Sequence, residues 1–143
     1  MSARVKVRAA IWVQDKLVVH RTSRLGKERV TLPGGWVGKR ESVTDALARE
    51  LDEELGVSVE IGELLCAAEI VNRASRQDVE LIFAGRIPDD VDPSRLSLVD
   101  PLGPEADRVL PPVLEQLAEQ RQATGETGAR WLGNLYLTDR AHT

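Results

Sequence analysis

Three glutamates, Glu50, Glu53 and Glu54, stand at positions i, i+3 and i+4 near the middle of the chain. If this segment is helical, a rotation of about 100° per residue places them within roughly a 100° arc of one helix face. Three carboxylates on one face repel one another, so something must offset the repulsion. Solvent does so on most acidic helix faces. The alternative is a hard divalent cation, which prefers several oxygen ligands close together.

The residues around the three glutamates favour the cation. Arg49 precedes Glu53 by four residues, within reach of an ion pair along a helix. Glu41 lies just before the segment, and Gly34 and Gly35 lie upstream of it, directly after a proline. Adjacent glycines after a proline mark a backbone that bends sharply or approaches another group closely. These neighbours make a merely solvated acidic face a less sufficient interpretation of the three glutamates.

The stretch from Gly35 to Val57 resembles the Nudix box, G-x5-E-x7-R-E-U-x-E-E-x-G-U with U an aliphatic residue, and every fixed position matches. The resemblance implies an α/β fold, a Nudix-like α/β/α sandwich with a mixed β-sheet, in which the box forms a loop, a helix and a loop. Members of this family hydrolyse nucleoside diphosphates linked to another group. The resemblance therefore implies an enzyme, a nucleotide pyrophosphohydrolase.

The resemblance also implies a role for each charged residue of the box. By similarity, Glu50 and Glu54 are the main metal ligands, and Glu53 is a further ligand or the base that deprotonates the attacking water. Arg49 orients the glutamates by ion pairing, and Glu41 pairs with Arg49 or contacts the metal through water. The cofactor is then Mg²⁺, with Mn²⁺ an alternative because both ions suit oxygen ligands.

The chemistry explains why carboxylates and a cation are needed. A diphosphate is negatively charged and repels an attacking water or hydroxide; a bound Mg²⁺ neutralises that charge and lowers the pKa of a bound water. A base within reach then takes the proton. We expect Glu53 to be the base. Glu69 and Glu80 are alternatives elsewhere in the chain, although each is more simply interpreted as a solvated charge at a strand edge.

Substrate recognition must come from outside the carboxylate face. Lys39 and Arg40, in the loop of the box, and the basic segment 21–29 before it either meet phosphates or are simply solvated. Trp36 follows the glycine pair and either stacks on a base or packs in the protein. Trp12 and Trp131 are expected in core or interface packing. The candidate substrate-binding residues are therefore Gly34, Gly35, Trp36, Lys39 and Arg40.

The elements that must position these residues are predicted from periodicity. The segment 42–55 is the clearest helix, with Ser42 as its cap, an apolar stripe at every fourth residue and Gly56 as its stop. Strands are expected over 5–13, 17–20, 57–68 and 79–84, with a hairpin turn at 14–15 and a bulge near Gly62. We expect loops over 21–29 and 87–112, a second helix over 113–122, and an extra strand or a dimer contact in the tail, about 124–143.

Composition sets the outer bounds. The chain has 143 residues, 42% hydrophobic and 29% charged, and we expect one domain, residues 1–143. A net charge of −4 gives no sign of nucleic-acid binding. Cys66, the single cysteine, excludes an internal disulfide and a cysteine-based zinc cluster, and is expected to be a small buried hydrophobe. The absence of a long apolar run predicts no membrane span and a cytoplasmic protein.

The sequence thus predicts metal-dependent hydrolysis of a diphosphate linkage in a nucleoside di- or triphosphate derivative, by water attack on phosphorus. The partner is a small-molecule nucleotide, with a homodimer through the apolar tail as a further expectation. The alternative is a module that binds or senses a nucleotide derivative on the same fold without cutting it. The markers of several family subtypes are missing, so the preferred substrate stays open.

Overall fold

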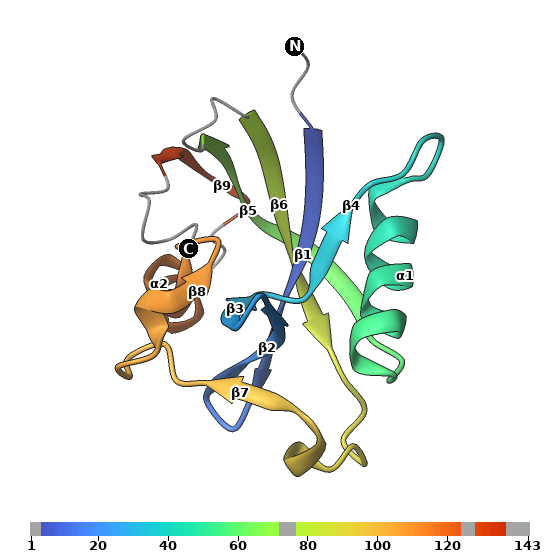
Figure 1. Cartoon of the computed structure of the whole chain (residues 1–143), viewed down its shortest axis with the longest axis vertical. Helices are drawn as coiled ribbons and strands as arrows, with labels where there is room; N and C mark the ends of the chain where they lie inside the picture. Colours follow the sequence, from blue (N-terminus) through green and yellow to red (C-terminus); the bar gives the residue numbers. More distant parts are fainter. Residues whose placement is uncertain (1–3, 72–76, 124–127, 137–143) are drawn as a thin grey trace.

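The structure, a computed structural model, describes residues 4–71, 77–123 and 128–136 (Figure 1). Strands dominate, with one longer helix inside the chain and one shorter helix towards its end. In chain order the elements are β1 (Arg4–Val13), β2 (Lys16–Arg24), β3 (Lys27–Thr31), β4 (Gly34–Trp36), α1 (Val43–Leu55), β5 (Glu60–Val71), β6 (Gln77–Arg86), the 3-10 turn η1 (Pro93–Arg95), β7 (Ser97–Val99), the 3-10 turn η2 (Ala106–Arg108), β8 (Val109–Leu110), α2 (Leu114–Gln122) and β9 (Arg130–Tyr136).

The sheet is mixed and runs in the order β8-β3-β2-β1-β6-β5-β9, with β4 also paired to β1 and β7 to β2. Strand β1 is central because it has three partners. Its first half pairs antiparallel with β4, its second half pairs antiparallel with β2, and most of its length pairs parallel with β6. The glycine pair on β4 is thereby fixed against the middle of the sheet.

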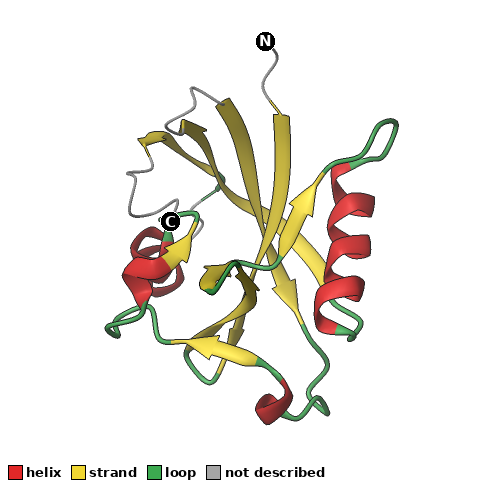
Figure 2. Cartoon of the chain, in the orientation of Figure 1, coloured by secondary structure: helices red, strands yellow, loops and turns green. Residues whose placement is uncertain are grey.

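Side chains on the two faces of β1 pack against different helices. Val7, Ala9 and Ile11 are buried in one apolar cluster with Leu47 and Leu51 of α1. Ala10 belongs to a second cluster, which includes residues of α2. The two helices accordingly lie on opposite sides of the sheet (Figure 2). The α/β/α sandwich with a mixed sheet is therefore confirmed.

Helix α1 begins and ends where its sequence predicts. The Ser42 hydroxyl accepts a hydrogen bond from the Asp45 backbone N–H at 3.1 Å, which satisfies one of the free donors at the helix start. Gly56 adopts a left-handed conformation with φ of 66°, and its N–H bonds to the Asp52 carbonyl. The two caps fix where the helix begins and ends, and therefore which face of the helix carries its glutamates.

The predicted loop over 21–29 is wrong. Strand β2 continues to Arg24, and β3 returns from Lys27 in register with it. Leu25 and Gly26 form the tight connection, with φ values of 52° and 77°. The segment is polar because it is an exposed hairpin, not because it lacks regular structure. The first hairpin, turning at Gln14 and Asp15 with positive φ, is confirmed.

The later part of the chain follows most of the predictions. Pairing of β5 with β6 shifts register between Ile61 and Leu64, which confirms the irregularity near Gly62. The segment 87–112 is mostly loop, although β7, β8 and two 3-10 turns lie within it. Strand β9 pairs parallel with β5, so the tail does supply an extra strand. The dimer contact stays a prediction.

Three side chains outside the box differ in their burial. Cys66 is buried, as predicted, and burial raises the pKa of its thiol to about 11. Trp131 is 62% exposed, so core packing is wrong for this residue and packing at an interface stays a prediction. Trp12 is partly buried against the core, with the Arg121 guanidinium 4.3 Å from its ring centroid. No helix in the described part of the chain is long and apolar enough to cross a membrane.

Candidate active site

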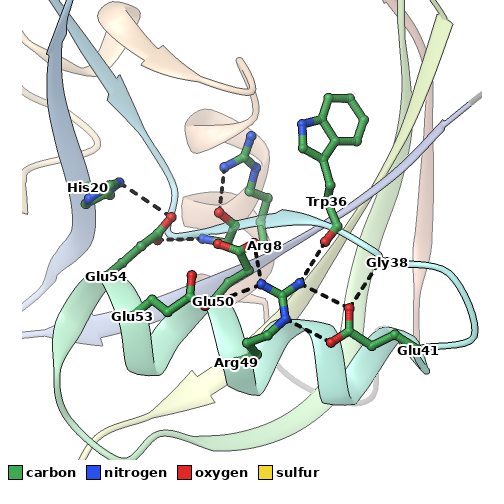
Figure 3. A network of polar contacts seen from close by, with 10 residues as sticks. Arg8, His20, Trp36, Gly38, Glu41, Arg49, Glu50, Glu53 and Glu54 are labelled. Carbon is green, nitrogen blue, oxygen red and sulfur yellow. Dashed lines mark hydrogen bonds and ion pairs between the residues drawn. The ribbon is translucent and has the colours of Figure 1, made fainter.

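The three glutamates of α1 divide into an inner pair and an outer residue. The side chains of Glu50 and Glu54 are 19% and 13% exposed, whereas that of Glu53 is 60% exposed. Figure 3 shows Glu50 and Glu54 beside the strand that carries the glycine pair, with Glu53 between them on the helix. The predicted carboxylate face therefore exists, and two of its three members are largely shielded from solvent.

The glycine pair meets the inner carboxylates directly. The Gly34 N–H donates to Oε2 of Glu54 at 2.9 Å. A Cβ at Gly35 would lie 2.6 Å from the carboxyl carbon of Glu50, so the absence of a side chain makes room for that carboxylate. Gly34 itself has φ of 142°, and a Cβ there would lie 1.9 Å from the Val7 carbonyl oxygen. Each glycine is required, but for a different reason.

Arg49 links the loop of the box to the helix. Its Nε and Nη2 donate to the two carboxylate oxygens of Glu41, at 2.9 and 3.1 Å, and its Nη1 donates to Glu50 at 3.0 Å. Nη2 also donates to the Trp36 carbonyl at 3.3 Å, and Nη1 lies 3.6 Å from Glu53. One guanidinium thus connects both ends of the box loop to the carboxylate face.

The charges of this network are strongly stabilised. Hydrogen bonds from Arg49, and then from the Gly38 N–H, lower the pKa of Glu41 to about 2. The pKa of Arg49 is raised, chiefly by its bonds to Glu41 and Glu50. Glu41 therefore remains a carboxylate at any physiological pH, and it is committed to holding Arg49.

Glu54 has the opposite electrostatic environment. Burial raises its pKa, and the Gly34 N–H, His20 and Arg8 oppose the rise in that order. The His20 Nδ1 lies 3.5 Å from Oε1 of Glu54. A shielded carboxylate near a second one, Glu50, is poorly compensated by the protein alone. This environment suits a cation better than a bare site.

Sequence reasoning missed two residues of this site, His20 and Arg8. His20 comes from β2 and is brought to Glu54 only by the fold. Arg8 is 6% exposed, and its Nε donates to Glu80 at 2.9 Å. The available signal was a charged residue in the middle of a strand otherwise rich in buried apolar residues, because such a charge must find a partner.

The two alternative bases outside the box have other roles. Glu80 is 4% exposed and paired with Arg8, so its interpretation as a solvated strand-edge charge is wrong. Glu69 accepts a hydrogen bond from the Gln77 side chain at 2.7 Å. Neither contacts Glu50 or Glu54 among the interactions of the described residues. Glu53 thus stays the expected base.

The predicted substrate-binding residues are only partly gathered. Lys39 and Arg40 are exposed in the loop between β4 and α1. Trp36 contributes its carbonyl to the site, but its ring packs with two cationic side chains of β1. The Arg4 guanidinium and the Lys6 ammonium lie 3.9 and 4.2 Å from the ring centroid. A nucleobase of the substrate could stack only on the part of this ring that the two cations do not cover.

The donor set fits a hard cation without being fully assembled. Within the described ranges, no three His, Cys, Asp or Glu side chains are gathered as closely as a metal site requires. Glu50 and Glu54 nevertheless offer shielded oxygen donors one helical turn apart, with the more exposed Glu53 on the same face. The residues therefore fit Mg²⁺ or Mn²⁺ by donor chemistry. A cation bound there would need side-chain rotation or substrate oxygens to complete its coordination.

Comparison with known families decides what kind of protein this is. The family model described as the NUDIX domain matches residues 3–112, which include the whole box and the strands around it. The chain belongs to the Nudix family. Nudix hydrolases are enzymes that generally depend on a divalent metal ion and act on small nucleotide derivatives. The recognition made from residues 35–57 is thereby confirmed.

Solved structures agree on the Nudix fold. A Nudix hydrolase from Nitrosomonas europaea has a TM-score of 0.72 at 21% identity and covers 96% of this chain and 81% of its own. A MutT Nudix hydrolase from Burkholderia pseudomallei shares 28% identity, with a TM-score of 0.55 and coverage of 69% and 82%. An ADP-ribose pyrophosphatase from Streptococcus suis shares 22% identity, with a TM-score of 0.63 and coverage of 91% and 99%. No curated protein matches the chain.

Proposed function

We propose that this Nudix hydrolase cleaves a diphosphate linkage in a nucleoside di- or triphosphate derivative, by metal-dependent attack of water on phosphorus. The observation that supports the proposal most is the shielded pair Glu50 and Glu54, set against the glycine pair of β4. Such a pair gathers negative charge in a shielded place, where a bound cation would add to the compensation that Arg49 and the Gly34 N–H already give. The family supports hydrolysis, and the carboxylate pair supports the metal.

In this proposal Glu50 and Glu54 are the main metal ligands, with Glu53 a further ligand or the base. The metal is Mg²⁺, with Mn²⁺ also accepted. When bound, it neutralises phosphate charge and lowers the pKa of a coordinated water. Glu53 is suited to take the proton because its carboxylate is exposed and free to reach an incoming water.

Arg49 and Glu41 have a positioning role in the same proposal. The paired donors of Arg49 hold Glu41 on one side and Glu50 on the other, so the loop and the helix cannot separate without breaking charge-assisted bonds. Substrate contacts are assigned to the exposed loop and to the glycine backbone. These residues are Gly34, Gly35, Trp36, Lys39 and Arg40.

The substrate class is a small nucleotide with a second group on its diphosphate. Similar structures include proteins named ADP-ribose pyrophosphatase and UDP-X diphosphatase, which places nucleotide sugars beside nucleoside triphosphates in the first panel. The panel would also contain oxidised triphosphates, CDP-alcohols, NADH and dinucleoside polyphosphates. Products would be resolved by chromatography, with Mg²⁺ and with EDTA. Cleavage that EDTA abolishes supports the proposal.

A pair of variants on one helix tests the metal ligand. Glu54→Gln removes one ligand charge and should abolish most turnover and weaken Mn²⁺ binding while the protein stays folded. Asp52→Asn is the matched control, because it removes one carboxylate charge from an exposed position of the same helix. Near-normal activity in Glu54→Gln would overturn the ligand assignment. A folded, Mn²⁺-binding protein that cuts nothing in the panel would point to the non-catalytic binding module.

A further inference from the structure

A buried ion pair lies against the glycine loop, on strands outside the box. Arg8 of β1 and Glu80 of β6 are 6% and 4% exposed, and their Nε and Oε1 atoms are 2.9 Å apart. The two residues are separated by 72 positions in sequence. Two charges removed from water gain little net stability from each other, since their loss of hydration offsets the attraction. A role other than stability is therefore worth seeking.

The guanidinium of Arg8 does more than pair with Glu80. Its Nη1 donates hydrogen bonds to two backbone carbonyls, that of Leu32 at 3.1 Å and that of Gly34 at 3.4 Å. These two carbonyls flank Pro33. Arg8 thus holds the chain on both sides of the bend, and Glu80 fixes the orientation of the guanidinium by occupying its Nε.

The other side of the same bend meets the helix. The Gly34 N–H donates to Oε2 of Glu54 at 2.9 Å. The Ala9 N–H donates to the Pro33 carbonyl at 2.9 Å, which ties the bend to β1 as well. A continuous set of polar contacts therefore leads from Glu80 through Arg8 and Gly34 to the Glu54 carboxylate.

We propose that Arg8, oriented by Glu80, is a positioning residue that fixes the Gly34 N–H and through it the Glu54 carboxylate. The role rests on the proposed function, in which Glu54 is a metal ligand. Arg8 touches neither substrate nor metal in this assignment. It keeps one oxygen of Glu54 bound to the backbone, which leaves the other oxygen at a fixed place for a cation. Groups that orient a ligand in this way are commonly worth 10- to 100-fold in metal affinity or activity.

The experiment separates positioning from packing. In Arg8→Met/Glu80→Leu both charges leave together, so no unpaired charge stays buried and the protein should remain folded. The Leu32 and Gly34 carbonyls nevertheless lose their donor. Arg21→Met is the control, because Arg21 pairs with Glu105 at 2.6 and 2.8 Å but contacts neither carbonyl. Mn²⁺ binding would be measured by electron paramagnetic resonance, alongside thermal unfolding and turnover.

We expect Mn²⁺ affinity and turnover to fall about 10-fold or more in Arg8→Met/Glu80→Leu, with Mn²⁺ affinity unchanged in Arg21→Met. Arg8→Lys keeps the charge but loses the planar guanidinium with its several donors, so this variant should retain only part of the wild-type Mn²⁺ affinity. A folded double variant that binds Mn²⁺ like the wild type would overturn the positioning role. Glu54→Gln separates the two hypotheses: if that variant also retains Mn²⁺ affinity, the proposed metal site itself is wrong.

Discussion

The adjacent glycines Gly34 and Gly35 should respond in opposite ways to the same substitution. At Gly34, an added Cβ would lie 1.9 Å from the Val7 carbonyl oxygen, in a backbone conformation with φ of 142°. The conformation alone costs about 1–3 kcal/mol for a residue with a side chain. The obstacle is backbone in the central strand, which cannot move without disturbing the sheet. We expect Gly34→Ala to lose at least about 3 kcal/mol of the 5–15 kcal/mol typical of a folded domain.

At Gly35 the obstacle is the movable end of a side chain. The added Cβ would lie 2.6 Å from the carboxyl carbon of Glu50 and 2.7 Å from Oε1. The carboxylate can rotate away, so the free energy of unfolding should change by no more than about 1 kcal/mol. Rotation would remove the 3.0 Å contact of Glu50 with Arg49 and displace a proposed metal ligand by about 1 Å or more. A displacement of that size is enough to lower turnover about 100-fold.

Thermal unfolding and turnover would be measured on both variants. For a chain of this size, a loss of about 3 kcal/mol lowers Tm by roughly 6–12 °C. Gly62→Ala is the control for replacing a strand glycine, because its added Cβ meets only ordinary contact with Ala84 at 3.4 Å. The reasoning is refuted if Gly34→Ala unfolds at the wild-type temperature, or if Gly35→Ala keeps wild-type turnover.

Two further outcomes follow from the charges of the site and its surroundings. Glu53→Gln should lower kcat more than it raises KM if Glu53 is the base, as steady-state kinetics would reveal, whereas a change confined to KM would indicate a binding role. Burial, followed by the charge of Arg8, lowers the pKa of Lys6 to about 8 from 10.5. The half-buried ammonium therefore destabilises the folded protein most below pH 8, and the free energy of unfolding should rise by at most about 3 kcal/mol as the pH increases from 8 towards 10.5. Urea unfolding of Lys6→Met should lack that rise, and an equal rise in both proteins would contradict the assignment.

The parts of the fold that sequence predicted best are those whose causes are local. Helix α1 has its cap at Ser42, its stop at Gly56 and its apolar stripe within one short segment, so nothing distant is needed to define it. The glutamate face follows from the helical repeat. The same locality explains why the contacts of Arg49 with Glu41 could be expected from the resemblance and why the structure contains them.

The errors arise where polarity was taken for lack of structure. The segment 21–29 is rich in charged residues, but such residues are also normal on an exposed hairpin. Pairing of β2 with β3 is a property of two strands together, and the alternation within either one is weak. Glu80 was misjudged for a related reason, since a charged residue on a strand is solvated only if no partner lies across the sheet. Its partner, Arg8, is adjacent only because β1 and β6 run parallel.

The residues of the site thus fall into two groups, a contiguous group within the box and a group from other strands. The carboxylates, Arg49 and the glycine pair lie within a contiguous stretch, and their spacing alone is enough to recognise the chemistry. Arg8 and His20 come from strands outside that stretch, and only the sheet topology brings them to the bend and to Glu54. The contiguous group specifies hydrolysis without specifying a nucleotide, so substrate preference is to be sought in the exposed loop that carries Lys39 and Arg40. Variants of that loop are where a change of preference is expected, whereas variants of Arg8 should weaken metal binding whatever the substrate.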